Sequence, residues 1–151
     1  MRLLYLITRA EPGGAQVHLL ELLRGFRDRA ELHLGVGEDQ DGFLVEEARA
    51  LGVRVHLLRH LVQPVRPVKD FRGLFEVMAL LRKVRPHLLH AHSSKAGFLG
   101  RLAGRALGVK SVFTAHGWAF TDGVPEGMKR LALSMERLAG RLGDLVLAVS
   151  E

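Results

Sequence analysis

Two adjacent glycines, Gly13 and Gly14, lie in the segment Thr8–Gln16, between a short apolar run and a helical pattern. Glycine lets the backbone approach a ligand closely, and the N-terminus of a helix presents unpaired N–H groups to an anion. This arrangement indicates a phosphate site, although a tight turn alone would also explain both glycines. The spacing matches neither the G-x-G-x-x-G pattern of dinucleotide-binding folds nor the Gly-Lys-Ser/Thr ending of a P-loop.

A second segment follows another apolar run and combines two histidines, two serines and a lysine: His90, His92, Ser93, Ser94 and Lys95. Strand alternation would place the two histidines on one side. A His-x-His pair can ligate a metal, but no carboxylate lies close in sequence, so no metal is expected. A serine here would cap the following helix, and the hydroxyls, the lysine and the helix start also suit a phosphate or a sugar hydroxyl.

A third segment places His116 at the end of an apolar run, followed by Gly117 and the only tryptophan, Trp118. A buried structural histidine is the plainer interpretation of His116. Three such segments at strand ends nevertheless favour a shared site. Neither a Ser-His-Asp order nor a close pair of carboxylates suggests hydrolysis.

The elements that position these segments alternate between two hydrophobic patterns. Short runs rich in Leu and Val are typical of strands buried on both faces, and i, i+3, i+4, i+7 spacing is typical of helices. The strands are predicted at Arg2–Thr8, Glu31–Val36, Val53–Leu58, His87–Ala91, Ser111–Ala115 and Leu145–Val149. This order predicts one Rossmann-like α/β domain over residues 1–151, with a mostly parallel sheet of about six strands and helices on both faces. In such a sheet ligands bind at the carboxyl ends of the strands, where all three segments lie.

Three helical stripes are predicted to face the core. Their residues are Leu19, Leu22, Leu23 and Phe26; Phe71, Leu74, Phe75 and Met78; and Met128, Leu131, Ala132, Met135, Leu138, Ala139 and Leu142. Helix ends are expected near Gly52, Pro86, Gly108 and Gly143. Pro64 and Pro67 predict an irregular connection over residues 59–69.

Four glycines recur within one predicted helix, at Gly97, Gly100, Gly104 and Gly108. Glycine lowers helix stability, so the repeat needs a reason. We predict that most of these glycines allow close packing of the helix against the sheet.

The composition narrows the class of protein. The chain has no cysteine, which excludes disulfides, thiolate zinc sites and cysteine nucleophiles. No apolar run approaches the roughly 20 residues that span a bilayer, and we expect a cytoplasmic protein. The absence of Asn and the preference for Arg suit a thermophilic source, although genome base composition would have the same effect.

The net charge of +6 has an uneven origin. The interval between Glu76 and Asp122 has no acidic residue and contains Arg82, Lys83, Arg85, Lys95, Arg101, Arg105 and Lys110. Solvated helix faces would explain many of these bases. An anionic ligand or an anionic membrane surface near this segment is the more specific hypothesis.

Taken together, the three segments resemble the amino-terminal domain of glycosyltransferase family 4, retaining enzymes of the GT-B fold. The matching elements are residues 11–18 (EPGGAQVH), residues 88–97 (LLHAHSSKAG) and residues 113–120 (FTAHGWAF). The Ser-Ser-Lys-Ala-Gly version is most similar to the branch that builds capsular, exopolysaccharide and lipid-linked glycans.

The resemblance implies transfer of a sugar from a nucleotide-diphosphate donor to a hydroxyl of a glycan or polyprenyl-phosphate-linked acceptor, without a metal or other cofactor. It implies that His116 is catalytic and that Gly13, Gly14, Gln16 and Gly117 contact the donor. Acceptor contacts are expected from His92, Ser93, Ser94, Lys95 and Trp118. Departure of a nucleotide diphosphate builds negative charge, which backbone N–H groups and an imidazole can stabilise.

In the family, a second Rossmann-like domain carries most of the donor site. We therefore expect this chain to be the acceptor-side half, inactive in isolation and peripheral to the inner face of the membrane. The main alternative is a non-catalytic nucleotide-binding or regulatory module of flavodoxin type. A dehydrogenase conflicts with the glycine spacing, and nucleic-acid binding lacks a recognised motif.

Overall fold

The computed structural model describes residues 1–10, 13–38, 42–62, 66–116 and 125–148. Strands and helices alternate along the chain, as predicted. The elements are β1 (Arg2–Arg9), α1 (Gly14–Phe26), β2 (Glu31–Glu38), α2 (Phe43–Ala50), β3 (Arg54–Leu57), α3 (Pro67–Val84), β4 (Leu88–Ala91), α4 (Ser94–Leu107), β5 (Lys110–Ala115), α5 (Glu126–Leu142) and β6 (Leu145–Ala148). All six predicted strands are present, with ends that differ by only a few residues.

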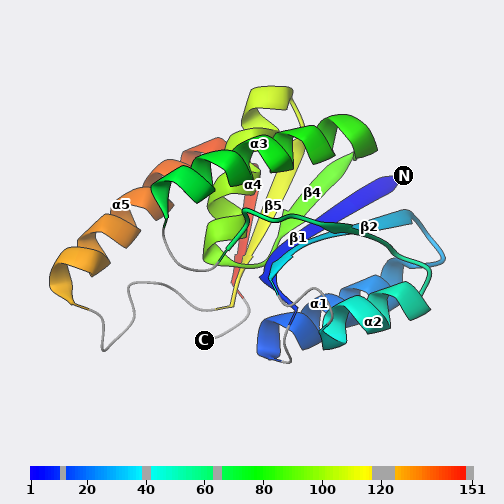
Figure 1. Cartoon of the computed structure of the whole chain (residues 1–151). Helices are drawn as coiled ribbons and strands as arrows, with labels where there is room; N and C mark the ends of the chain where they lie inside the picture. The colour runs from blue at the N-terminus through cyan, green and yellow to red at the C-terminus, as the bar shows by residue number, and fades with distance from the viewer. Residues whose placement is uncertain (11–12, 39–41, 63–65, 117–124, 149–151) are drawn as a thin grey trace.

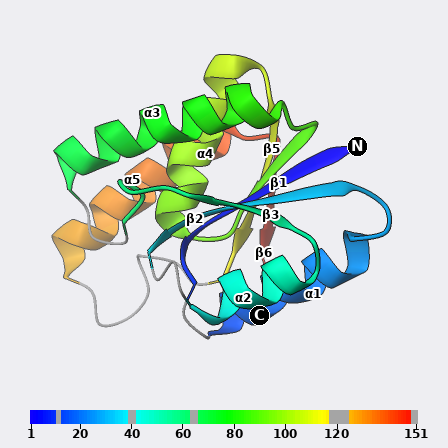
Figure 2. The same ribbon diagram turned by 45° about the vertical axis from the view of Figure 1, so that its right-hand side comes forward.

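The strands form one sheet in the order β3-β2-β1-β4-β5-β6, and every neighbouring pair is parallel. Helices α1 and α2 lie on one face, and α3, α4 and α5 lie on the other (Figures 1 and 2). The chain proceeds from β1 to β2 on one side and from β4 to β5 on the other. The boundary between β1 and β4 is therefore the point at which the strand order reverses.

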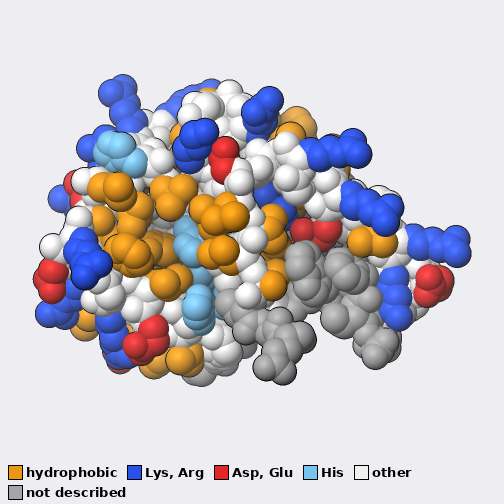
Figure 3. Space-filling view, turned by 180° about the vertical axis from the view of Figure 1, so that it is seen from behind, with side chains coloured by type: hydrophobic (Ala, Val, Ile, Leu, Met, Phe, Trp, Pro, Cys, Tyr) orange, Lys and Arg blue, Asp and Glu red, His pale blue; other side chains and the backbone are white. Residues whose placement is uncertain are grey.

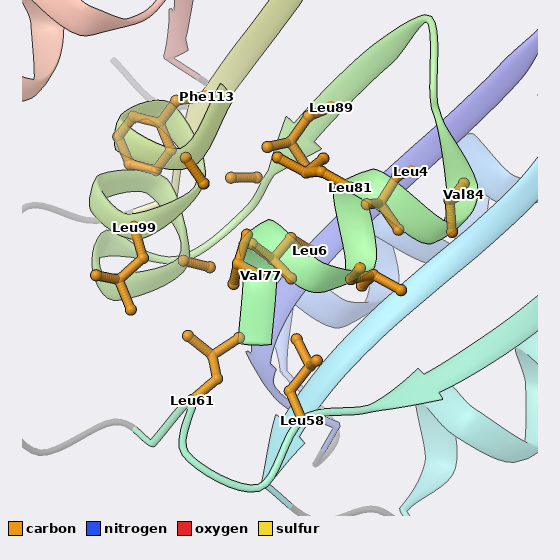
Figure 4. Close-up of a cluster of buried hydrophobic side chains, with 14 of the residues drawn as sticks. Leu4, Leu6, Leu58, Leu61, Val77, Leu81, Val84, Leu89, Leu99 and Phe113 are labelled. Carbon is orange, nitrogen blue, oxygen red and sulfur yellow. The ribbon is translucent and has the colours of Figure 1, made fainter. Parts of the chain in front are cut away.

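Strand β1 supplies both halves of the core through its alternating side chains. Leu4 and Leu6 pack with α3 and α4 in one cluster, which Figure 4 shows. Leu3, Tyr5 and Ile7 pack with α1 and α2 in the other. Burial on both faces explains why the strand is almost continuously apolar.

The helix ends largely follow the predicted signals. Gly52 and Gly108 have positive φ, which glycine adopts without strain. The connection expected to be irregular up to residue 69 ends earlier, because α3 begins at Pro67. Proline is favoured at this first helical position, where no intrahelical N–H bond is lost.

The glycines of α4 pack as predicted against the sheet. A Cβ at Gly97 would lie 2.6 Å from the ring of Phe113, and one at Gly100 would lie 3.2 Å from Leu89. A Cβ at Gly104 would lie 3.0 Å from the carbonyl oxygen of Val109. The absence of side chains lets α4 approach β4 and β5 closely.

All three predicted core stripes are wrong in part. In α1, Leu19 and Leu23 are buried as predicted, but Phe26 is 38% exposed. The side chains of Phe71 and Phe75 in α3 are 63% and 54% exposed, and only the neighbouring Leu74 and Met78 pack on the core. In α5 only Ala139 is fully buried, and the exposed positions include Met128, Leu131, Met135 and Leu138, while the Ala132 side chain lies outside the described residues. Helical periodicity shows that a face is apolar, but it does not show that another element covers that face.

The sheet also has an uncovered apolar region. Leu145, Val146 and Leu147 of the edge strand β6 are 51%, 41% and 41% exposed. Viewed from behind, apolar side chains gather on this face with histidines among them (Figure 3). Helices α1 and α2 contact the β3 side of the sheet and leave this part open (Figure 2).

The acid-free interval does not form the continuous cationic surface that its sequence suggests. Arg101 is 99% buried, lies over the ring of Phe113 and reaches Glu136 at 3.1 Å. Lys110 lies 3.5 Å from Asp144. These acids come from outside the interval, so a count along the chain could not detect the pairing. A membrane contact through Arg101 is therefore excluded.

Among the described residues, no helix has both the length and the apolar composition needed to cross a bilayer.

Candidate functional site

A pocket of about 270 Å³ lies where the strand order reverses, at the carboxyl ends of β1, β4 and β5. This is the edge at which ligands bind in open parallel sheets. The lining residues come from all three segments singled out in the sequence: Ile7, Thr8, Arg9, Ala15, Gln16, His92, Ser93, Ser94, Phe113 and His116. The topology therefore brings the predicted segments together in one place.

The glycine segment starts α1 beside this pocket. Gly13 precedes the helix, and no side chain caps its first turn. Gln16 folds back so that its amide nitrogen donates to the carbonyl of Arg9 at 2.9 Å. A Cβ on Gly13 would lie 2.7 Å from the Gln16 Oε1 atom, which is the end of a flexible side chain and can move aside, so this contact alone does not require glycine. The first turn of α1 therefore presents backbone N–H groups to the pocket, as an anion requires.

Ser93 has a structural role at the start of α4. Its hydroxyl accepts hydrogen bonds from the Ala96 N–H at 3.4 Å and from the Thr8 hydroxyl at 2.8 Å. The Thr8 N–H also points to the same oxygen, at 3.3 Å. These bonds cap α4 and fix its first turn to the end of β1. Ser94 lies beside this cap and lines the pocket.

The structure places Lys95 next to the pocket but not in its wall. The Lys95 Nζ atom lies 2.6 Å from Asp70 Oδ1, and the two side chains are 10% and 21% exposed. This ion pair joins the first turn of α4 to the first turn of α3. The pair accounts for the low exposure of the lysine and holds the two helix starts together.

Four histidine rings gather on the sheet side of the pocket. The His90 and His92 ring centroids are 4.1 Å apart, which confirms the prediction that the two histidines share a side. The His92 and His116 rings stack at 5.4 Å, and His18 of α1 meets the edge of His116 at 5.1 Å. The Nε2 atom of His90 lies 2.6 Å from the Thr114 hydroxyl. Within the described part of the chain, no three His, Asp or Glu side chains are arranged to hold a metal ion.

The hydrogen bond between His92 and His116 couples their tautomers. His92 Nδ1 and His116 Nε2 are 3.1 Å apart, and one proton must lie between them. His92 is 99% buried, and its Nε2 atom has no partner among the described residues. When neutral His92 donates through Nδ1, neutral His116 carries its own proton on Nδ1. In the opposite arrangement His116 donates through Nε2 and His92 carries its proton on Nε2, so the tautomer of each ring fixes that of the other.

Burial keeps His90, His92 and His116 uncharged near neutral pH. It lowers the pKa of His92 to about 2 and that of His90 to about 4, and neighbouring histidine charges act in the same direction. The pKa of His116 is also lowered, first by burial and then by the charge on His18. His116 is therefore a neutral hydrogen-bonding group, which differs from a fixed cation at the pocket.

Two predicted contact residues, Gly117 and Trp118, lie outside the described residues. Conversely, the structure adds Thr8, Arg9 and His18 to the residues around the pocket. Their positions at the end of β1 and in the first turns of α1 were the available sequence signal. Local spacing could not identify the partners of these side chains, because all of them are distant in sequence. Arg9 pairs with Glu38, Thr8 bonds Ser93, and His18 contacts the rings of His92 and His116.

The geometry of the pocket agrees with a match over almost the entire chain. Residues 12–151 match the model of Glycosyltransferase Family 4. The chain belongs to glycosyltransferase family 4. The resemblance inferred from the three segments is thereby confirmed.

Relatives of this glycosyltransferase family 4 chain include two enzymes of Escherichia coli. One is the UDP-Gal:alpha-D-GlcNAc-diphosphoundecaprenol alpha-1,3-galactosyltransferase, which is 31% identical over 137 residues, covering 84% of this chain and 35% of that protein. The other is the O-antigen biosynthesis glycosyltransferase WbnH, which is 25% identical over 149 residues, covering 97% of this chain and 41% of that protein. The chain thus spans about two fifths or less of the length of these relatives.

Solved structures agree with the fold. Anabaena HepE in complex with UDP and glucose superposes with a TM-score of 0.72 and 22% identity, over 97% of this chain and 37% of that one. Acinetobacter baumannii MurG superposes with a TM-score of 0.70 and 13% identity, over 100% of this chain and 42% of that one. At such identities the likeness supports the fold alone, which is the Rossmann-like α/β arrangement predicted from the sequence.

Proposed function

We propose that this chain is the acceptor-binding domain of a retaining glycosyltransferase. The enzyme would move a sugar from a nucleotide-diphosphate sugar to a hydroxyl of a lipid-linked glycan during polysaccharide assembly. The observation that supports this most is the convergence of two helix starts, α1 and α4, on one pocket that also contains His116. Each helix start favours negative charge, so the pocket suits two phosphorylated partners, a donor and an acceptor.

The acceptor class follows from the same features. A galactosyltransferase relative is named for an acceptor with GlcNAc joined through a diphosphate to undecaprenol. The first turn of α4, with Ser94 in the pocket wall, would receive the phosphate of such a molecule. Its sugar hydroxyls would meet the neutral imidazole of His116; Trp118, another expected acceptor contact, lies outside the described residues.

In this proposal the departing nucleotide diphosphate gathers negative charge near the first turn of α1. The N–H groups after Gly13 would stabilise that charge without a metal ion. His116, with its tautomer coupled to that of His92, would donate a hydrogen bond to the donor sugar. Retention of configuration and the identity of the donor belong to the proposal as well. Peripheral contact with an anionic membrane completes it.

Binding of a short-chain GlcNAc-diphospholipid to the chain tests the proposal. We expect calorimetry to detect this ligand, and we expect Ser94→Asp to weaken its binding at least tenfold. An aspartate there repels phosphate but favours the helix dipole, so the fold should be retained. Ser134→Asp, on the exposed surface of α5, is the matched control and should bind like the wild type.

Three results would count against the proposal. If Ser94→Asp binds the acceptor as tightly as the wild type, the first turn of α4 is not the phosphate site. Tight binding of nucleotides without acceptor binding would favour the regulatory-module alternative. Turnover of a sugar nucleotide by this chain alone would contradict its assignment as the acceptor-binding half.

A further inference from the structure

Helix α3 exposes an apolar stripe that the fold does not use. Val68, Phe71 and Phe75 are 68%, 63% and 54% exposed. Their i, i+3, i+7 spacing places them along one face of the helix. The rings of Phe71 and Phe75 meet edge to face with centroids 5.1 Å apart, so they form one continuous aromatic surface. Exposed apolar surface of this kind marks a site of association.

The charged residues of α3 are divided by sign. Both acids face inward: Asp70 pairs with Lys95 at 2.6 Å, and Glu76 accepts bonds from the backbone N–H groups of Arg59 at 2.9 Å and His60 at 2.7 Å. The exposed charged side chains of this helix are the bases Lys69, Arg72, Arg82 and Lys83, and Arg66 is exposed just before its first turn. The aromatic stripe is therefore bordered by positive charge, and the negative charges of the helix are already paired within the fold.

We infer that the Val68–Phe71–Phe75 face of α3 binds an anionic lipid surface. Aromatic rings between basic side chains suit the interface of a bilayer, where the rings enter the boundary between headgroups and acyl chains and the bases attract the headgroups. Lys69 and Arg72 lie beside the exposed rings, so one face of the helix presents both an apolar surface and positive charge. This combination matches the two layers of an anionic bilayer surface.

The role of this membrane contact follows from where the α3 face lies, and it rests on the proposed function. The Lys95–Asp70 ion pair fixes the first turn of α3 to the first turn of α4. Ser94, at the start of α4, lines the pocket. A bilayer bound by α3 would thus lie beside the helix start proposed to receive the acceptor phosphate. This assigns the membrane contact to α3, which shares only the bases Arg82 and Lys83 with the acid-free interval.

Flotation with vesicles tests this surface without an activity measurement. We expect the chain to float with vesicles of phosphatidylcholine and phosphatidylglycerol at 7:3 in low salt, and to bind phosphatidylcholine alone far more weakly. Lys69→Gln combined with Arg72→Gln should weaken binding by about 30-fold, from roughly 1 kcal/mol per basic residue near an anionic surface. Phe71→Ser combined with Phe75→Ser should weaken it by about tenfold or more, because the rings supply the apolar term.

A variant in α5 provides the matched control. Leu131 and Leu138 are exposed to a similar extent, at 63% and 52%, on another helix. Leu131→Ser combined with Leu138→Ser should leave flotation unchanged, and circular dichroism should show that every variant is folded. Failure of the wild type to bind anionic vesicles, or loss of binding only in the α5 variant, would overturn the assignment. Acceptor binding measured in solution does not depend on this result, so the two proposals can fail separately.

Discussion

His92 should make the domain less stable in mild acid. Its imidazole is 99% buried, and burial lowers its pKa from 6.5 to about 2. In the unfolded chain the ring takes up a proton as the pH falls below 6.5, but in the native state it does not. The unfolded state then binds more protons, so the free energy of unfolding falls as the pH falls. The contribution is complete above pH 6.5 and is lost progressively toward the native pKa.

The magnitude follows from the width of that interval. At about 1.4 kcal/mol per pH unit, a change from pH 6.5 to pH 5.0 removes about 2 kcal/mol through His92 alone. The pKa of His90, lowered to about 4, adds a loss of the same sign over this interval, because its native pKa also lies below pH 5.0. With a urea m-value of about 2 kcal/mol per molar, the His92 contribution corresponds to a decrease of about 1 M in the urea concentration at the unfolding midpoint.

The assay is urea unfolding at pH 7.0 and pH 5.0 of the wild type and of His92→Asn. The asparagine does not titrate and keeps a polar atom near the Nδ1 position that bonds His116. The change in the free energy of unfolding between pH 7.0 and pH 5.0 should be smaller in His92→Asn than in the wild type by about 2 kcal/mol. His87→Asn, at an exposed position, is the control and should behave like the wild type. An equal pH dependence in wild type and His92→Asn would refute the reasoning.

Two further predictions concern α4. Gly97→Ala should destabilise the domain by about 1–3 kcal/mol, because the new methyl group would lie 2.6 Å from the Phe113 ring. Gly140→Ala, in open space on α5, should be neutral or stabilising in the same thermal melts. Equal effects at both positions would contradict the packing of α4 on Phe113. Glu136→Leu should lower the free energy of unfolding by about 3–5 kcal/mol, because it leaves the buried Arg101 charge unpaired. Adding Arg101→Met should restore most of that stability. If the losses of the two substitutions simply add, the two side chains are not coupled.

The sequence predicted the sheet well because β1, β2 and β5 are buried on both faces and leave a strong apolar signal. It also predicted the edge that holds the site, since all carboxyl ends of a parallel sheet lie together. It could not identify partners that come from distant elements. The ion pairs Lys95–Asp70 and Arg101–Glu136 join residues far apart in sequence, and they changed two apparent surface cations into structural groups.

The same limit explains the wrong core stripes. Periodicity in α3 and α5 correctly predicted helices with an apolar face, but part of each face is exposed. In α3 the buried side chains turn toward α4, and within the described part of the chain no element covers the remaining aromatic positions. When the apolar face of a helix is wider than the surface that contacts its neighbours, sequence periodicity predicts all of that face to be buried.

The placement of His116 is a property of the whole sheet and not of its own loop. The parallel register of β4 and β5 pairs Ala91 with Phe113, so that His92 follows the paired region directly and His116 follows the end of β5, three residues beyond Phe113. Phe113 holds β5 against α4 through the space that Gly97 leaves open. A glycine in α4 therefore acts on the histidine pair through the strand that carries His116. The Gly-rich helix and the His-Gly segment look like separate motifs in the sequence. In the fold they act together, and both position the imidazole of His116 at the pocket.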